Sequence, residues 1–270
     1  MSAELEDADL IVDLHGTSRT RVLTLRQKAP VLRAPSYRVR RSALVHARWA
    51  RLAPPPTALA RMSAALAPVG LMTQEVPRVT AGDEAEQWAA AWLASWAPGR
   101  APVALMPGAR HFTKRWPEAH WISLHEGLRA QGLPLLYLSL ASERAALPAL
   151  AERAAADPAV RWSTDSLARM AALLSRAGAA VSSDSGLMHL AAARGTRVVA
   201  LFGSTAPELG FAPAGLGHRV LCRHEPCQPC TIHGRASCPK GHFRCMRELL
   251  PEAVLEATQA LLAAPVGTTA

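Results

Sequence analysis

Short runs of apolar residues alternate with amphipathic stretches along most of the 270-residue chain. Short apolar runs are typical of buried strands, and apolar positions spaced by three or four residues are typical of helices that cover a sheet. The apolar runs lie at 10–14, 31–34, 103–106, 135–140, 179–182 and 198–202. The predicted helices lie at 18–27, 43–50, 58–67, 83–96, 118–131, 142–156, 166–176, 185–193 and 251–262. This alternation predicts β-α-β units and an α/β fold with parallel sheets.

A break in the pattern at Pro98 and Gly99 divides the strands into two series. A chain of this length is long enough for two modest domains. We expect a first domain over residues 1–97 and a second over 98–250. The amphipathic helix at 251–264 is expected to return to the first domain and complete it.

The charge of the chain indicates an anionic partner. Thirty Lys and Arg against twenty-one Asp and Glu give a net charge of +9, which favours association with anions. An aromatic content of 5% and the lack of a recognition module argue against nucleic acid. No apolar run reaches the roughly 18 residues of a membrane-spanning helix, and the acidic first nine residues do not resemble a secretory signal. We therefore expect a cytoplasmic protein that does not span the membrane.

The stretch 181–195 carries the most specific chemical signal. A predicted strand ends at Asp184, and Asp184 or Ser185 is placed to cap the helix that follows. Free N–H groups and the dipole at such a helix start attract phosphate, and Gly186 allows a ligand to approach the backbone closely. His189 lies four residues after Ser185, on the same face of the helix. The sequence thus predicts a phosphate-binding helix start.

A second signal is the basic stretch 106–117, which follows the first strand of the second series. Open α/β sheets bind ligands at the carboxyl ends of their strands. Lys114 offers a mobile point charge and Arg115 a planar fork, so the pair suits a diphosphate. The other interpretation is a solvated basic loop, with Pro117 opening the next helix.

The five cysteines are concentrated in the segment 222–245. Four of them form the pattern C-x2-C-x7-C-x6-C: Cys227, Cys230, Cys238 and Cys245. Four thiols at such spacing in a cytoplasmic protein are compatible with a structural zinc ion. The alternative is a set of reduced thiols, or a disulfide formed on isolation. We expect thiols and no cofactor, and we keep zinc as the alternative.

Together these motifs resemble glycosyltransferase family 9, the heptosyltransferases of lipopolysaccharide inner-core synthesis. The resemblance runs from Asp9 to about Leu262 and rests on the loop 107–117, the helix start 184–193 and the turn 201–205. The Cys-rich segment is similar to the heptosyltransferase II branch. The resemblance implies a GT-B architecture, in which two Rossmann-like domains face a cleft and the second holds the nucleotide sugar. It also implies an inverting, metal-independent transfer of a heptose from ADP-heptose to the phosphorylated inner core.

The family's donor site, carried over to this sequence, begins with the loop after the first strand of the second domain. The resemblance implies that Lys114 neutralises the donor diphosphate, with Thr113 beside it. It also implies that Ser185 and Gly186 contact phosphate through their backbone N–H groups.

Two further donor-side residues follow from the same comparison, and a third follows from its position in the sequence. Asp184 and His189 would orient the sugar or the phosphate. Glu143 follows the strand at 135–140 and would accept hydrogen bonds from ribose hydroxyls, although a helix cap on the surface is the other interpretation.

The acceptor side of the resemblance lies near the start of the chain. Residues 13–21 look like the family's acceptor-side loop, and Arg19 and Arg21 would clamp acceptor phosphates. A solvated helix face is the alternative for both arginines. The implied acceptor is a phosphorylated lipopolysaccharide core, so the protein would act in the cytoplasm, peripheral to the inner membrane.

The general base is the point at which this sequence departs from the family. Members begin with a strand that leads into a Gly-Asp loop, whose Asp is thought to take the acceptor proton. This chain starts after that unit, so we expect an incomplete first domain and no family base. Asp13 is a weak replacement because it lies within a predicted strand. The sequence therefore leaves two functions open: sugar transfer, or binding of a nucleotide or nucleotide sugar without turnover.

Overall fold

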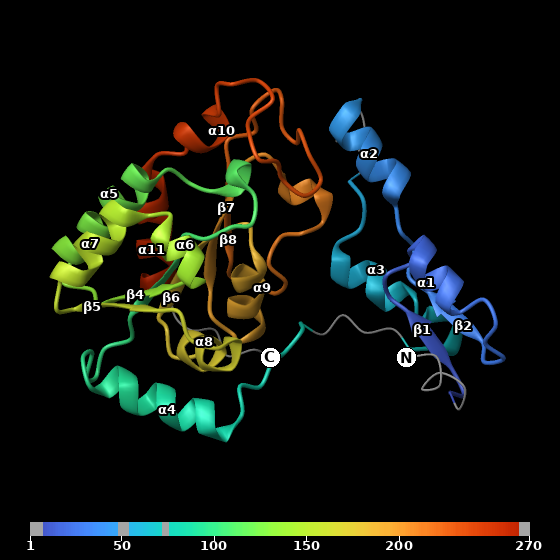
Figure 1. Ribbon diagram of the computed structural model, residues 1–270, viewed down its shortest axis with the longest axis horizontal. Coiled ribbons are helices and arrows are strands. Elements are labelled where there is room, and N and C mark those ends of the chain that lie inside the picture. Colours follow the sequence, from blue (N-terminus) through green and yellow to red (C-terminus); the bar gives the residue numbers. More distant parts are fainter. Residues whose placement is uncertain (1–7, 48–53, 72–75, 265–270) are drawn as a thin grey trace. The chain divides into compact units, whose positions relative to one another are not determined.

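A computed structural model describes residues 8–47, 54–71 and 76–264 (Figure 1). These residues belong to two compact units. Unit 1 comprises Met1–Glu75 together with Glu208–Phe211. Unit 2 comprises Val76–Pro207 together with Ala212–Ala270.

Unit 1 starts with a small β-α-β motif, as the apolar pattern predicts. Strands β1 and β2 are parallel, with Ile11 opposite Val31 and Asp13 opposite Arg33, and Thr17 caps the helix between them. The elements of this unit are β1 (Ile11–Asp13), α1 (Ser18–Leu23), β2 (Val31–Arg33), α2 (Arg38–His46), α3 (Ala58–Ala64) and the 3-10 helix η3 (Ala67–Val69).

Unit 2 is built around a six-stranded sheet with the order β5-β4-β3-β6-β7-β8. All neighbouring strands are parallel. The strands are β3 (Val103–Met106), β4 (Leu135–Leu138), β5 (Val160–Ser163), β6 (Ala179–Ser183), β7 (Val198–Phe202) and β8 (Arg219–Cys222). The α/β fold with parallel sheets is thus confirmed.

Helices cover both faces of this sheet, because successive side chains of a strand point to opposite faces. Val103 and Leu105 of β3 belong to a core with α5, α7 and α11, whereas Ala104 and Met106 belong to a core with α4, α8 and α9. The helices of the unit are α4 (Asp83–Ala94), α5 (Glu118–Ala130), α6 (Ala141–Ala145), α7 (Pro148–Ala156), α8 (Leu167–Leu174), α9 (Gly186–Ala193), α10 (Arg244–Arg247) and α11 (Pro251–Ala263). Burial on both faces explains why the strands read as continuous apolar runs.

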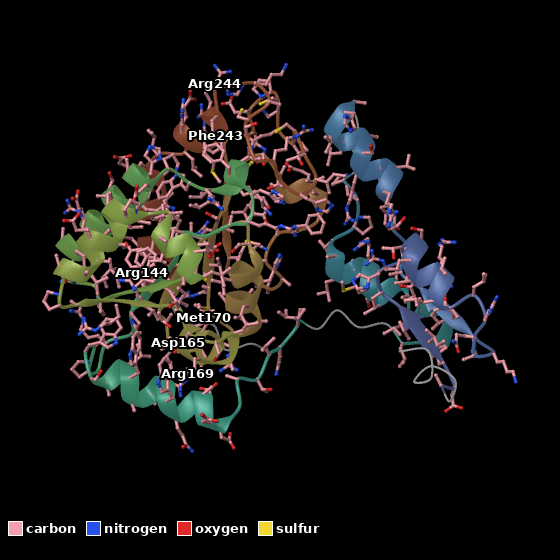
Figure 2. The ribbon with its side chains drawn as sticks, in the orientation of Figure 1. Arg144, Asp165, Arg169, Met170, Phe243 and Arg244 are labelled. Atoms are coloured by element: carbon pink, nitrogen blue, oxygen red, sulfur yellow. The ribbon has the colours of Figure 1, made fainter. Side chains whose placement is uncertain are left out.

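The structure divides the chain differently from the predicted boundary at residue 97. Helix α4, expected in the first domain, packs on α8 of unit 2. Arg169 of α8, labelled in Figure 2, lies 4.4 Å from the centre of the Trp88 ring of α4. Helix α11 was expected to complete the first domain. It contacts α5, β6 and β7 instead, and it buries Val254 and Leu261 in the core of unit 2. Apolar burial therefore decides where both helices belong.

Several predicted elements differ in detail from the observed ones. The sequence gives no prediction for β5 or β8, and the single helix predicted at 142–156 is split into α6 and α7 before Pro148, because a proline favours the first turn of a new helix. The helix predicted at 43–50 is α2, which starts earlier, and residues 48–50 lie outside the described residues.

Candidate donor site in unit 2

The middle of the sheet is a topological switch point. Strands β3 and β6 are neighbours, and the chain order runs outward from them in opposite directions. Open α/β sheets bind ligands outside the carboxyl ends of the strands at such a point. Residues 107–117 follow β3 and residues 184–193 follow β6. Both motifs selected from the sequence therefore begin at this one position in the fold.

An ion pair joins the two motifs. Lys114 Nζ lies 2.8 Å from Asp184 Oδ2, and the two side chains are 15% and 6% exposed. The Thr205 hydroxyl donates to the same carboxylate oxygen over 2.7 Å. Because the pair is largely shielded from water, the attraction between its two charges is weakly screened, and Asp184 holds the ammonium group in place.

Thr113 holds the Lys114 loop in place. Its buried hydroxyl accepts hydrogen bonds from Ser204 Oγ and from Arg235 N, both over 2.8 Å. The backbone N–H of Ser204 donates to the Thr113 carbonyl over 3.1 Å. These bonds fix the 3-10 helix η4 (Phe112–Lys114), which carries the lysine. The Thr113 hydroxyl is thus already engaged within the protein.

The start of helix α9 is open to a ligand. Ser185 occupies the N-cap position in an extended conformation, without a side-chain capping bond. A Cβ atom added to Gly186 would meet no atom within 4 Å. The N–H groups of the first helical turn have no intrahelical partner, so this helix start has the properties of an anion site.

His189 lies one turn further along α9. Its pKa is lowered, mainly because surrounding protein atoms displace water from the ring; Asp184 opposes this shift and Lys114 adds to it. This shift favours the neutral imidazole, which can donate one hydrogen bond and accept another.

Glu143 lies directly above the loop that follows β3. A Cβ atom on Gly108 would be only 2.2 Å from Glu143 Cδ. The same carboxylate accepts a hydrogen bond from Leu140 N over 3.0 Å, at the start of α6. Glu143 therefore caps a helix and also contacts the loop that follows β3, so the two interpretations of this residue are compatible.

The Cys-rich segment braces the turn at residues 203–205. Cys230 N donates to Ser204 O over 3.0 Å, and the Gln228 side chain donates to Gly203 O. All five cysteines are free thiols. Burial, reinforced by the other thiols nearby, raises the pKa of Cys245 to about 12. Among the described residues, no group of three or more His, Cys, Asp or Glu side chains has an arrangement suited to a metal ion.

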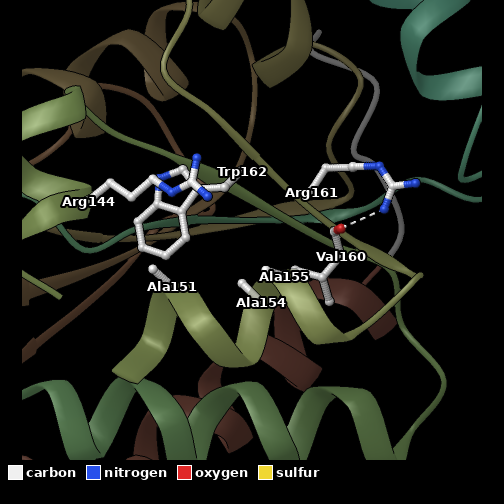
Figure 3. Close-up of a pocket in the computed structure, with 7 residues that line it drawn as sticks. All are labelled: Arg144, Ala151, Ala154, Ala155, Val160, Arg161 and Trp162. Carbon is white, nitrogen blue, oxygen red and sulfur yellow. Dashed lines mark hydrogen bonds between the residues drawn. The ribbon is translucent and has the colours of Figure 1, made fainter. Parts of the chain in front are cut away.

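A separate hollow of about 240 Å³ lies beside the edge strand β5 (Figure 3). Its polar side chains interact with their own surroundings. The Arg144 guanidinium stacks 5.7 Å from the centre of the Trp162 ring, and Arg161 Nη1 donates to Val160 O over 2.8 Å. None of the predicted site residues lines this hollow.

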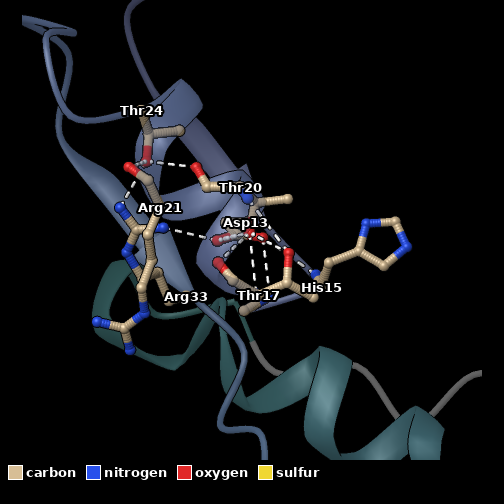
Figure 4. A network of polar contacts seen from close by, with 8 residues as sticks. Asp13, His15, Thr17, Thr20, Arg21, Thr24 and Arg33 are labelled. Atoms are coloured by element: carbon tan, nitrogen blue, oxygen red, sulfur yellow. Dashed lines mark hydrogen bonds and ion pairs between the residues drawn. The ribbon is translucent and has the colours of Figure 1, made fainter.

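In unit 1, Asp13 organises the predicted acceptor-side loop (Figure 4). One carboxylate oxygen accepts from the backbone N–H groups of His15 and Gly16, at 3.1 and 2.9 Å. The other accepts from the Thr20 hydroxyl at 2.9 Å and pairs with Arg33 Nη1 at 2.6 Å. Burial favours the protonated acid, but these four donors outweigh it and lower the pKa of Asp13. Such a carboxylate is poorly suited to accept a proton.

Arg19 and Arg21 lie on α1 and are both exposed. In the part of the chain that the structure describes, neither guanidinium makes a hydrogen bond or an ion pair. Both side chains are therefore available to a ligand, and equally compatible with a solvated helix face.

Fold and site together define a Rossmann-like α/β protein with anion-binding groups at the switch point of its sheet. Residues 3–239 match the model of glycosyltransferase family 9 (heptosyltransferase). The chain therefore belongs to glycosyltransferase family 9.

Relatives with known names support this membership. The chain is 35% identical over 189 residues to lipopolysaccharide heptosyltransferase 1 of Pseudomonas aeruginosa, a match that covers 64% of this chain and 51% of that protein. It is 28% identical over 173 residues to lipopolysaccharide heptosyltransferase 2 of Escherichia coli, covering 60% and 47%. The chain thus spans about half the length of these curated relatives.

Solved structures show the same fold. A family 9 glycosyl transferase from Veillonella parvula superposes with a TM-score of 0.75 at 17% identity, covering 96% of this chain and 75% of that one. E. coli heptosyltransferase WaaC with ADP superposes with a TM-score of 0.63 at 22% identity, with the same coverage. The chain therefore shares the GT-B-type fold of these glycosyltransferases.

Proposed function

We propose that this chain serves the transfer of a heptose from ADP-heptose to the inner core of lipopolysaccharide, with inversion and without a metal ion. The observation that carries the proposal is the Lys114–Asp184 pair at the switch point of a family 9 fold. The solved heptosyltransferase WaaC has been obtained both with ADP and with ADP-2-deoxy-2-fluoro heptose, which supports an ADP-sugar as the donor.

In this proposal the donor diphosphate lies between Lys114 and the start of α9. Negative charge grows on the departing ADP as the bond to the sugar breaks, and groups already aimed at that charge lower the barrier. Lys114 and the N–H groups near Ser185 and Gly186 supply the stabilisation. Asp184 and His189 orient the sugar or the phosphates, and Glu143 accepts from the ribose hydroxyls.

On the acceptor side, we propose that Arg19 and Arg21 contact phosphates of the lipopolysaccharide core. Within the described residues no helix is long and apolar enough to cross a bilayer. The proposed place of action is the cytoplasmic surface of the inner membrane, where this acceptor would be presented.

A second candidate function is nucleotide-sugar binding without turnover. It is favoured by the environment of Asp13, whose carboxylate is already occupied by four donors. A general base must accept a proton from the acceptor hydroxyl, and Asp13 is the candidate that this chain offers for that step.

A paired measurement separates the two functions. Calorimetry with ADP and ADP-heptose tests donor binding, and mass spectrometry of a heptose-deficient core acceptor tests transfer. Binding together with transfer supports the enzyme, whereas binding alone supports the second candidate. Failure of ADP to bind at millimolar concentration would refute both.

Gly186→Ala is expected to weaken ADP binding at least tenfold while leaving stability unchanged or slightly higher. The new methyl group would meet no protein atom within 4 Å, and alanine is favoured over glycine in a helix by about 1 kcal/mol. Only a ligand close to the backbone would encounter it. Calorimetry and urea unfolding of the same preparation check both parts, and unchanged affinity would place the phosphates elsewhere.

The thiols are expected to be dispensable for ADP binding, because the backbone N–H of Cys230 and the side-chain amide of Gln228 hold the turn at Ser204 and Gly203. Cys227→Ser and Cys238→Ser should keep the affinity for ADP within about twofold of the parent value. Elemental analysis of reduced protein tests the expected lack of a cofactor, and stoichiometric zinc would contradict it.

A further inference from the structure

The described part of unit 1 contains a buried arginine, Arg41, without an oppositely charged partner there. Arg41 on α2 is 7% exposed, and its Nε donates to the Leu209 carbonyl over 3.2 Å. Its guanidinium carbon lies 4.7 Å from the centre of the Phe211 ring. The Nη2 atom is buried and has no hydrogen-bond partner among the residues that the structure describes.

A second arginine approaches the first from α3. Arg61 Nη1 donates to the carbonyls of Pro35 and Ser36 over 3.3 and 3.5 Å. Its buried Nε has no partner within the described ranges. Burial lowers the pKa of Arg41, and the positive charge of Arg61 lowers it further. Among the described residues no carboxylate pairs with either guanidinium.

The arrangement of Arg41 and Arg61 is energetically unfavourable as long as no anion is bound beside them. A buried charge without a counterion is costly, and a buried N–H without an acceptor adds the cost of its lost hydration. Two like charges near each other increase the penalty. The group that would relieve all three costs is an oxyanion, because its oxygens accept from guanidinium forks with matching geometry.

We propose that Arg41 and Arg61 form an oxyanion-binding site in unit 1, which takes a phosphate or carboxylate group of an anionic ligand. Under the proposed function, the ligand that carries this group is the lipopolysaccharide core acceptor. The identity of the ligand rests on that function, whereas the oxyanion site itself does not. Arg41 and Arg61 differ from the exposed Arg19 and Arg21. A buried guanidinium has already lost most of its water contacts, so it loses fewer of them when a ligand binds.

The test is a calorimetric titration with inorganic phosphate in a Lys114→Ala background, which removes the phosphate-binding lysine of unit 2. We expect the Lys114→Ala protein to bind phosphate. Adding Arg41→Met or Arg61→Met to it should weaken phosphate binding at least tenfold. Arg38→Met is the matched control, because Arg38 lies on the same helix with the same charge but is exposed. It should change the affinity less than twofold.

Two further measurements make the result decisive. Without phosphate, Arg41→Met should unfold at the same or a higher temperature than its parent, since it removes a buried unpaired charge; marked destabilisation would show a structural guanidinium and overturn the proposal. The proposal would also be overturned if Arg41→Met bound phosphate as tightly as its parent, or if the parent bound none.

A titration with acetate in place of phosphate distinguishes a carboxylate ligand from a phosphorylated one. No nucleotide is present, so this site and the donor site can fail independently.

Discussion

Lys114→Ala is expected to weaken ADP binding by roughly 10- to 150-fold. The lysine is the cation at the switch point, and a hydrogen bond to a charged group contributes about 1.5–3 kcal/mol. Its position is fixed by Asp184 at 2.8 Å and by the buried Thr113 next to it. The variant therefore removes one well-placed charge and leaves the rest of the phosphate site in place. Calorimetry with ADP measures the loss.

The loss should be confined to the phosphates. Adenosine, which lacks them, is expected to bind Lys114→Ala as it binds the parent. Arg110→Ala is the control for loop charge, because Arg110 is exposed in the same loop. Lys114→Ala leaves Asp184 without its cation, so the double variant Lys114→Ala/Asp184→Asn shows whether any effect comes from the unpaired carboxylate. Undiminished ADP binding in Lys114→Ala and in the double variant would remove Lys114 from the site.

The parallel fold and the two donor motifs follow from local sequence signals. Continuous apolar runs at 103–106 and 179–182 give strands that are buried on both faces. Chain order then puts the residues after both strands at one edge. For this reason Lys114 and Asp184 could be assigned to a common site before their distance was known.

The supporting contacts could not be predicted, because they depend on side-chain packing across the fold. Thr205 reaches Asp184 over 21 residues of sequence, and Ser204 reaches Thr113 over 91. The Gly-Ser-Thr turn was a visible signal, but its partners were not. Strand β5 escaped prediction because Arg161 and Ser163 alternate with Val160 and Trp162, so the segment contains no continuous apolar run. The buried charge of Arg41 was hidden for a similar reason, since the basic helix α2 looks solvated in sequence.

Asp13→Asn is expected to destabilise unit 1 by about 2–4 kcal/mol. Removing one partner of a buried ion pair costs about 3–5 kcal/mol, and the 27% exposure of the Arg33 side chain reduces this. The asparagine side chain would keep one acceptor oxygen, but it could not accept hydrogen bonds both from the backbone N–H groups on one side and from Thr20 and Arg33 on the other. Asp9→Asn is the matched control, because Asp9 carries the same charge and is exposed.

The pH dependence of the wild-type protein should agree with this assignment. The pKa of Asp13 is lower in the folded protein than its ordinary value of 3.8, so the unfolded chain takes up its proton first as pH falls. The stabilisation is therefore fully present above about pH 5 and is lost below it, as pH falls through the folded pKa. Asp13→Asn should lack this part of the acid transition.

Hydrogen exchange measured by mass spectrometry can separate this structural role from catalysis. If Asp13 orders the loop, peptides covering residues 11–33 should exchange faster in Asp13→Asn, with unit 2 and ADP affinity unchanged. If Asp13 were the general base, exchange would stay as in the parent and transfer would fall by roughly 10²- to 10⁴-fold. The four donors already bound to its carboxylate favour the first result, because a proton could be accepted only after at least one of them had left.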